Sequence, residues 1–158
     1  MPHKKTEKEQ PFIYMEDLHV GQKFTAGPVW VTEKEIIAFG KQYDPQDFHT
    51  DPVKAKSSAF GELVASGWHT AALSMRMIVA AVPPMKGGMI GRSAEKISWP
   101  RPVRPGDRLS LEVEILELRI SDNKPERGIM RTRNTTVNQE GRPVMTMETI
   151  VFVPRKNP

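Results

Sequence analysis

The chain has 158 residues, of which 27% are charged and 38% are hydrophobic, and none is cysteine. This length predicts one globular domain with its own core, and the lack of cysteine excludes disulfides, thiolate catalysis and cysteine-ligated metal sites. The net charge of +4 is small, the basic residues are scattered, and three tryptophans and two tyrosines are few for a base-stacking surface. We therefore expect a cytoplasmic protein that binds no nucleic acid.

The first forty residues predict an arm, a strand and a short helix. Residues 1–11 are mostly polar and lack the apolar stretch of a signal peptide, so we expect a flexible N-terminal arm before a single domain over residues 12–158. A strand is expected within residues 20–31. Thr32 and Glu35 have the spacing of a capping box, which predicts a helix that starts at residue 33 and ends at Gly40.

The remainder predicts one helix and a sheet. Residues 67–82 are apolar on nearly all sides before Pro83, which indicates a long helix enclosed by protein; Arg76 interrupts this run, which is too short to span a membrane. A glycine-rich loop is expected over residues 85–91. Strands follow over residues 94–99, 108–120, 128–138 and 143–153. The pattern predicts an α+β fold, in which an antiparallel sheet wraps around one long central helix and dimerisation covers what the helix leaves open.

The densest group of chemically active side chains lies in residues 43–52. Asp44 and His49 are too far apart in sequence to stack on one helix, but a loop that folds back would let both bind one water and transfer its proton. Gly67 then opens the long helix, where free backbone N–H groups favour a developing oxyanion. The alternative is purely structural: Asp51 and Pro52 form a helix N-terminus and the other residues form a turn.

A later turn adds a resemblance to a known family, through its residues Pro102, Val103, Gly106 and Asp107. With Asp44, His49 and Asp51 at the spacing of a hydratase motif, the chain resembles the MaoC-like dehydratases, hot-dog-fold relatives of (R)-specific enoyl-CoA hydratases. Gly67 matches the helix-opening glycine of that family, and residues 138–144 are similar to its last turn. The resemblance covers roughly residues 12–153 and implies a hot-dog fold.

The resemblance also implies an activity. Such a protein adds water to the 2,3-double bond of an enoyl-CoA in fatty acid metabolism, or dehydrates the 3-hydroxyacyl-CoA. Asp44 and His49 would be catalytic, and the N–H of Gly67 would bind the thioester oxygen. No metal or redox cofactor is implied, since coenzyme A or acyl carrier protein is part of the substrate. A homodimer, or a larger assembly of such dimers, is the implied form.

Several positions depart from the family pattern and leave alternatives open. Gln46 and Asp47 stand where the family has Asn and Pro, and Ser66, Trp68 and His69 surround the helix start. We expect Asp47 to be a solvated carboxylate, and four residues to contact substrate: Gln46, Ser66, Trp68 and His69. For His69 a packed, hydrogen-bonded histidine is the alternative. A hot-dog acyl-CoA thioesterase and a non-catalytic acyl-CoA-binding subunit are the two alternatives to a hydratase.

Overall fold

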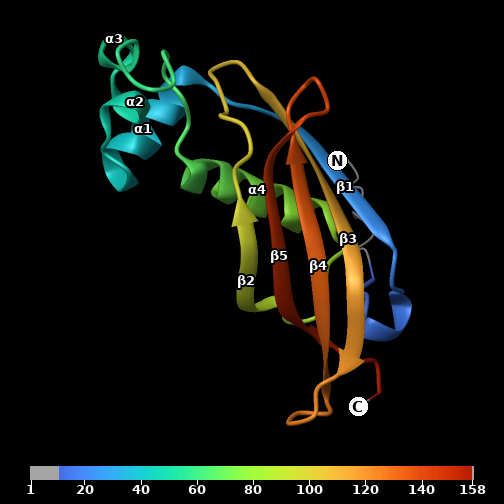
Figure 1. Cartoon of the computed structure of the whole chain (residues 1–158). Helices are drawn as coiled ribbons and strands as arrows, with labels where there is room; N and C mark the ends of the chain where they lie inside the picture. Colours follow the sequence, from blue (N-terminus) through green and yellow to red (C-terminus); the bar gives the residue numbers. More distant parts are fainter. Residues whose placement is uncertain (1–10, 158) are drawn as a thin grey trace, which may run out of the picture.

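Figure 1 shows the computed structural model, which describes residues 11–157. Its main element is one five-stranded sheet of order β1-β3-β4-β5-β2, in which all neighbouring strands are antiparallel. The strands are β1 (Lys23–Trp30), β2 (Ile90–Ser98), β3 (Arg108–Ile120), β4 (Arg127–Val137) and β5 (Pro143–Pro154). β1 and β2 form the two edges. The first ten residues of the expected arm lie outside the described part of the chain.

The alternating pattern of β3 explains how the sheet divides polar from apolar side chains. Leu111 and Val113 are buried, whereas Glu112 and Glu114, which alternate with them, point to the other face. The expected strand over 108–120 is confirmed, and the strands after it lie within one residue of their expected bounds. β2 begins earlier than expected, because Ile90 already pairs with Phe152 of β5.

The long helix α4 (Gly67–Ala81) lies along one face of the sheet (Figure 1), and Pro83-Pro84 follows its C-cap residue Val82. Its inner side buries Thr70, Ser74 and Met77. The expectation that protein encloses the whole helix is wrong for the single chain, because Trp68, Met75 and Val79 remain exposed. One sheet covers only one side of a helix, so the outer side needs another layer.

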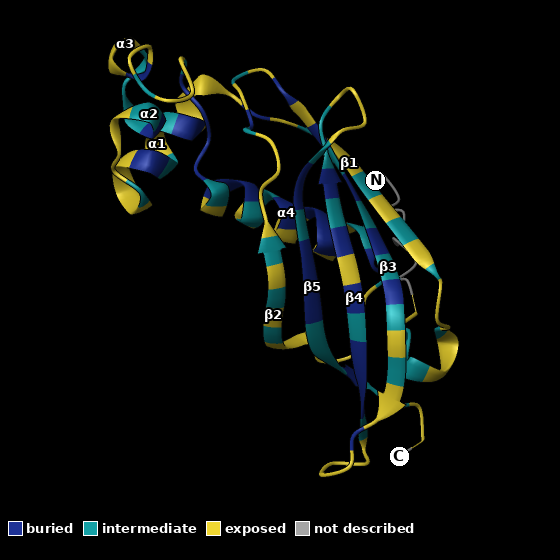
Figure 2. Ribbon diagram, viewed as in Figure 1, coloured by how far each residue is buried: buried dark blue, intermediate teal, exposed yellow. Residues whose placement is uncertain are grey.

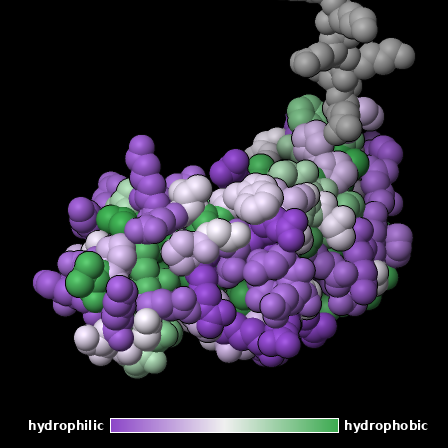
Figure 3. All heavy atoms as spheres, turned by 90° about the horizontal axis from the view of Figure 1, so that it is seen from above, coloured by the Kyte–Doolittle hydropathy of each residue, from purple (hydrophilic) through white to green (hydrophobic). Residues whose placement is uncertain are grey.

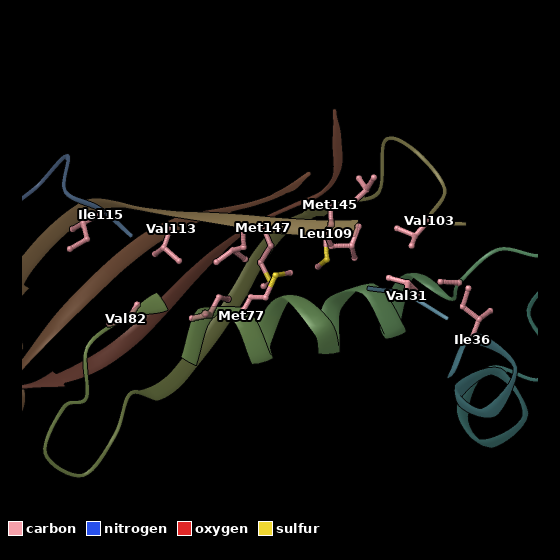
Figure 4. Packing of buried hydrophobic residues seen from close by; sticks show 14 of the residues in the cluster. Val31, Ile36, Met77, Val82, Val103, Leu109, Val113, Ile115, Met145 and Met147 are labelled. Carbon is pink, nitrogen blue, oxygen red and sulfur yellow. The ribbon is translucent and has the colours of Figure 1, made fainter. Parts of the chain in front are cut away.

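The core lies between α4 and the sheet, and Figure 2 shows buried residues in dark blue both on α4 and on β4 and β5, which cross it. Figure 4 shows Met77 of α4 beside Met147 of the sheet, and Val103 near Val31 at the other end of the helix. Within this core Ser74 Oγ lies 2.6 Å from Thr136 Oγ1, so a buried hydroxyl pair joins helix and sheet.

Three shorter helices stand to one side of the sheet: α1 (Glu33–Tyr43), α2 (Asp47–Thr50) and α3 (Pro52–Ala55) (Figure 1). The capping box of Thr32 and Glu35 is confirmed. The expected stop at Gly40 is wrong: a Cβ there would lie 2.6 Å from the carbonyl oxygen of His49, so this glycine permits a close backbone approach inside a continuing helix. Asp51 caps α3 as the structural alternative predicted.

The surface of this helical segment is partly apolar. Figure 3 shows hydrophobic residues among polar ones on the side where α1–α3 lie. The large exposed hydrophobic residues there are Tyr43, Val53 and Phe60.

A 3-10 turn η1 (Met15–Asp17) packs near the chain end, where Glu16 pairs with Arg155. Within residues 11–157 no helix is long and apolar enough to cross a membrane.

Candidate active site

Asp44 and His49 are brought into contact by the break between α1 and α2. Asp44 ends α1, Gln46 precedes α2, and the chain turns back between them. His49 Nε2 therefore lies 3.2 Å from Asp44 Oδ2, and the exposed fractions of the two side chains are 7% and 20%. The predicted folding back is confirmed, and it gives a nearly buried acid–imidazole pair.

The His49 ring is held from its other nitrogen. Nδ1 lies 2.7 Å from the carbonyl oxygen of Val64, and because a carbonyl only accepts hydrogen bonds, Nδ1 carries the hydrogen. The N–H of Val64 in turn donates to Phe48 O at 3.0 Å, and the Phe48 ring packs edge-on against the imidazole at 4.6 Å. The ring orientation is thus fixed, with Nε2 directed toward Asp44.

The carboxylate of Asp44 receives two further hydrogen bonds. Gln46 Nε2 donates to Oδ1 at 2.6 Å, and Ser66 Oγ donates to Oδ2 at 2.7 Å. Burial by itself raises the pKa of Asp44, but these hydrogen bonds and the nearby His49 outweigh it, so the pKa lies below its ordinary value. Asp44 is therefore a charged carboxylate at neutral pH.

Ser66 connects this pair to the start of α4. It is the N-cap residue, and its buried hydroxyl accepts the N–H of Trp68 at 3.2 Å while it donates to Asp44. Gly67 is the first residue of the helix, so its N–H has no carbonyl within the helix to bind. One serine side chain thus places a free helix N-terminus beside the acid–imidazole pair.

Trp68 and His69 point in different directions. Trp68 is exposed and packs edge-on against Trp99, with ring centroids 5.3 Å apart. His69 is buried and stacks on Phe39 of α1 at 4.9 Å. Burial lowers the pKa of His69 despite the opposing charge of Glu35. Its Nδ1 has no hydrogen-bond partner among the residues that the structure describes.

Asp47, the extra carboxylate of the motif, lies away from the pair. Its side chain is 65% exposed and forms a salt bridge of 3.8 Å with Lys54. The expectation of a solvated carboxylate is confirmed. Asp44, three residues before the first residue of α2, is the acid that faces His49.

The turn that contains Val103 and Asp107 helps to position the start of α4. Asp107 accepts the N–H of Arg104 at 2.9 Å and the side-chain amide of Gln139 at 3.0 Å, which fixes the turn. Val103 then offers its carbonyl to the N–H of Ala65 at 2.8 Å. Because Ala65 directly precedes Ser66, this hydrogen bond positions the N-cap of α4.

The large apolar cavity lies elsewhere, under the C-terminal half of α4. Its volume is about 1010 Å³, and neither Asp44, His49 nor Gly67 lines it. Five methionines contribute to its walls: Met75, Met85, Met89, Met130 and Met147. Trp68 and His69 do not reach it either, so this cavity is separate from the helix start. Among residues 11–157 no group of three His, Cys, Asp or Glu side chains is placed to hold a metal ion.

Comparison with known proteins matches a family model, described as a MaoC like domain, to residues 17–138. The chain belongs to this family. The MaoC-like chain is similar to the MaoC-like dehydratase from Rhodospirillum rubrum, with 41% identity, a TM-score of 0.86, and coverage of 92% of this chain and 99% of that one. R-hydratase PhaJ1 from Pseudomonas aeruginosa shows 28% identity and a TM-score of 0.72, with coverage of 93% and 89%.

A curated relative is the uncharacterized protein YdeM of Bacillus subtilis strain 168, which is 28% identical over 141 residues, or 89% of this chain and 99% of that protein. The family resemblance and the hot-dog fold predicted from sequence are confirmed by these structures. Family membership places the MaoC-like chain in a family of hydratases and dehydratases.

Two groups that shape the site carried no usable signal in the sequence. The Val64 carbonyl orients His49, yet every residue has a carbonyl, and its place depends on a contact 15 residues apart. Trp99 Nε1 donates to Gly67 O across 32 residues. The sequence places Trp99 shortly before the turn that carries the family resemblance, but it does not indicate the contact with Gly67.

Proposed function

We propose that the MaoC-like chain is a hydratase/dehydratase acting on the 2,3-double bond of an acyl thioester, with an enoyl-CoA and its 3-hydroxyacyl-CoA as the substrate pair. One observation carries the proposal: the Asp44–His49 contact of 3.2 Å is tied through Ser66 to the free helix start at Gly67. An acid–base pair beside an oxyanion site suits addition of water to a conjugated carbonyl compound.

In the hydration direction, one water binds to both Asp44 and His49. The lowered pKa of Asp44 makes its carboxylate a weak base, so the proton of the water passes to Nε2 of His49 as the oxygen bonds to C3. Asp44 stabilises the imidazolium, and Val64 keeps Nδ1 protonated. His49 then returns one proton to C2. The substrate gains one water, and both side chains recover their starting charges.

Gly67 acts on the thioester oxygen. When the oxygen of water adds to C3, negative charge moves onto this carbonyl as an enolate, and the N–H of Gly67 binds it. The positive end of the α4 dipole favours the same charge. Since the enolate carries more charge than the ground-state carbonyl, this hydrogen bond stabilises the transition state more than the bound substrate.

The proposed form is a cytoplasmic homodimer. The outer side of α4 exposes Trp68, Met75 and Val79, and the edge strand β2 exposes Ile90. Exposed large apolar side chains beside an unpaired strand edge favour a second copy that covers both. The cytoplasmic location is supported by the absence of cysteine from the chain.

The test is a panel of 2-enoyl-CoAs of different chain length and branching, starting with crotonyl-CoA. Loss of the enoyl absorbance and release of free thiol are followed in parallel on the same samples. Hydration without thiol release supports the proposal. Thiol release would instead indicate a thioesterase, and binding without turnover across the whole panel would indicate a non-catalytic acyl-CoA-binding subunit.

A further inference from the structure

Trp99 lies directly against the first residue of α4. Its indole N–H donates to the Gly67 carbonyl oxygen at 2.9 Å. A Cβ on Gly67 would lie 2.7 Å from Cε2 of the ring and 2.9 Å from Nε1, closer than side chains tolerate. The glycine at position 67 is thus required by the indole ring, which occupies the space of a side chain.

The same ring also restrains the next residue. Trp99 packs edge-on against Trp68 at an interplanar angle of 78°. The peptide between Gly67 and Trp68 is therefore held at both ends, because Trp99 binds its C=O and Ser66 Oγ binds its N–H at 3.2 Å. Trp99 is still 40% exposed, so burial in the core does not account for its position.

We infer that Trp99 is a positioning residue that fixes the direction of the Gly67 N–H toward the thioester oxygen, an inference that rests on the proposed function. Glycine has the largest backbone freedom of any residue, and a first-turn N–H has no intrahelical bond to hold it. Hydrogen bonds weaken steeply with misalignment. Clamping the following peptide restrains Gly67 and so keeps its N–H aligned as the enolate forms.

Trp99→Phe tests this inference because phenylalanine keeps a ring but lacks the N–H. We expect kcat on crotonyl-CoA to fall about 10-fold, a fraction of the roughly 10²–10³ lost when an oxyanion donor is removed outright, while KM changes less than about twofold. Trp30→Phe is the matched control. Trp30 is 60% exposed and lies under Arg108 at 5.1 Å, and its replacement is expected to leave both constants unchanged.

A second comparison asks whether the ring is the reason for glycine. Gly67→Ala is made in the wild type and in Trp99→Leu, and folding of each is checked by circular dichroism. The added methyl group is expected to lower kcat at least about 10-fold more in the wild type than in Trp99→Leu, since the atoms it meets are gone. An equal loss in both backgrounds would overturn the inference. Where Gly67→Ala does not fold, Trp99→Phe decides.

Hydrogen exchange gives a readout that does not need activity. Trp99→Phe is expected to speed exchange of the Trp68 amide, and Trp30→Phe is not. A wild type that turns over no enoyl-CoA refutes the proposed function and the positioning role of Trp99 together. An active wild type with an unchanged kcat in Trp99→Phe refutes only the inference about Trp99.

Discussion

Removing either member of the acid–imidazole pair is the most direct test of the proposed chemistry. Asp44→Asn keeps the shape of the side chain and an oxygen for the Ser66 hydroxyl, but it loses the negative charge that faces His49 Nε2 at 3.2 Å. His49→Gln removes the proton acceptor. Each change is expected to cut the hydration rate by about 10²–10⁴, which corresponds to about 3 to 5 kcal/mol of transition-state stabilisation.

The double variant distinguishes a joint action from two separate ones. Because Asp44 and His49 act on one water, the hydration rate of the Asp44→Asn/His49→Gln variant is expected to fall about as far as that of the less active single variant. This loss is far smaller than the product of the two single losses. The assay is the loss of enoyl absorbance with crotonyl-CoA. Circular dichroism and light scattering on the same samples check that the fold and the oligomeric state are unchanged.

Asp47→Asn is the matched control, since it removes the neighbouring carboxylate of the same motif. Its side chain is 65% exposed and pairs with Lys54, so the rate is expected to stay within about twofold of the wild type. A folded Asp44→Asn variant with nearly normal hydration would refute the reasoning. A large loss in Asp47→Asn instead would show that the other carboxylate is the catalytic one.

The remaining predictions concern three side chains of α4. Because burial lowers the pKa of His69 in the folded protein, the unfolded chain binds more protons at this histidine than the folded chain does below the ordinary pKa of about 6.5, so the free energy of unfolding falls as the pH drops from 7 toward 5. Urea unfolding should show a weaker pH dependence of this free energy in His69→Phe, and an unchanged pH dependence would contradict the prediction. Trp68→Leu is expected to change the preference for acyl chain length more than it changes turnover on the best substrate. An unchanged chain-length preference would show that Trp68 does not contact the acyl chain. Val79→Glu places a charge on the exposed side of α4 and is expected to yield monomers by light scattering; a stable, active wild-type monomer at micromolar concentration would exclude the obligate dimer.

The sequence alone determined the elements whose signals are local. β3 was predicted at its observed bounds because its side chains alternate in polarity with the period of a strand. Thr32 and Glu35 marked the start of α1, and Pro83 marked the end of α4, since capping and proline act within one helical turn. The spacing of Asp44 and His49 and the glycine at the helix start likewise indicated the candidate site.

Tertiary structure decided what these local signals left open. Gly40 has the residue type of a helix stop, yet the helix continues, because the backbone of His49 packs against it from the next helix. The family spacing already favoured Asp44 over Asp47 as the partner of His49, but the contact itself forms through the chain reversal before α2, which partly buries Asp44 and leaves Asp47 in solvent. These contacts join residues across turns, where the sequence carries no periodicity.

The finer geometry of the site depends on still longer contacts. Val64 orients the imidazole through a backbone carbonyl that any residue would supply, and Trp99 holds Gly67 from 32 residues away. The outer side of α4 is exposed because a single sheet covers only one side of a helix, although its composition indicated a helix buried all round. The composition of a helix indicates how much apolar surface it carries, whereas only the folded structure shows which part of that surface the sheet leaves exposed.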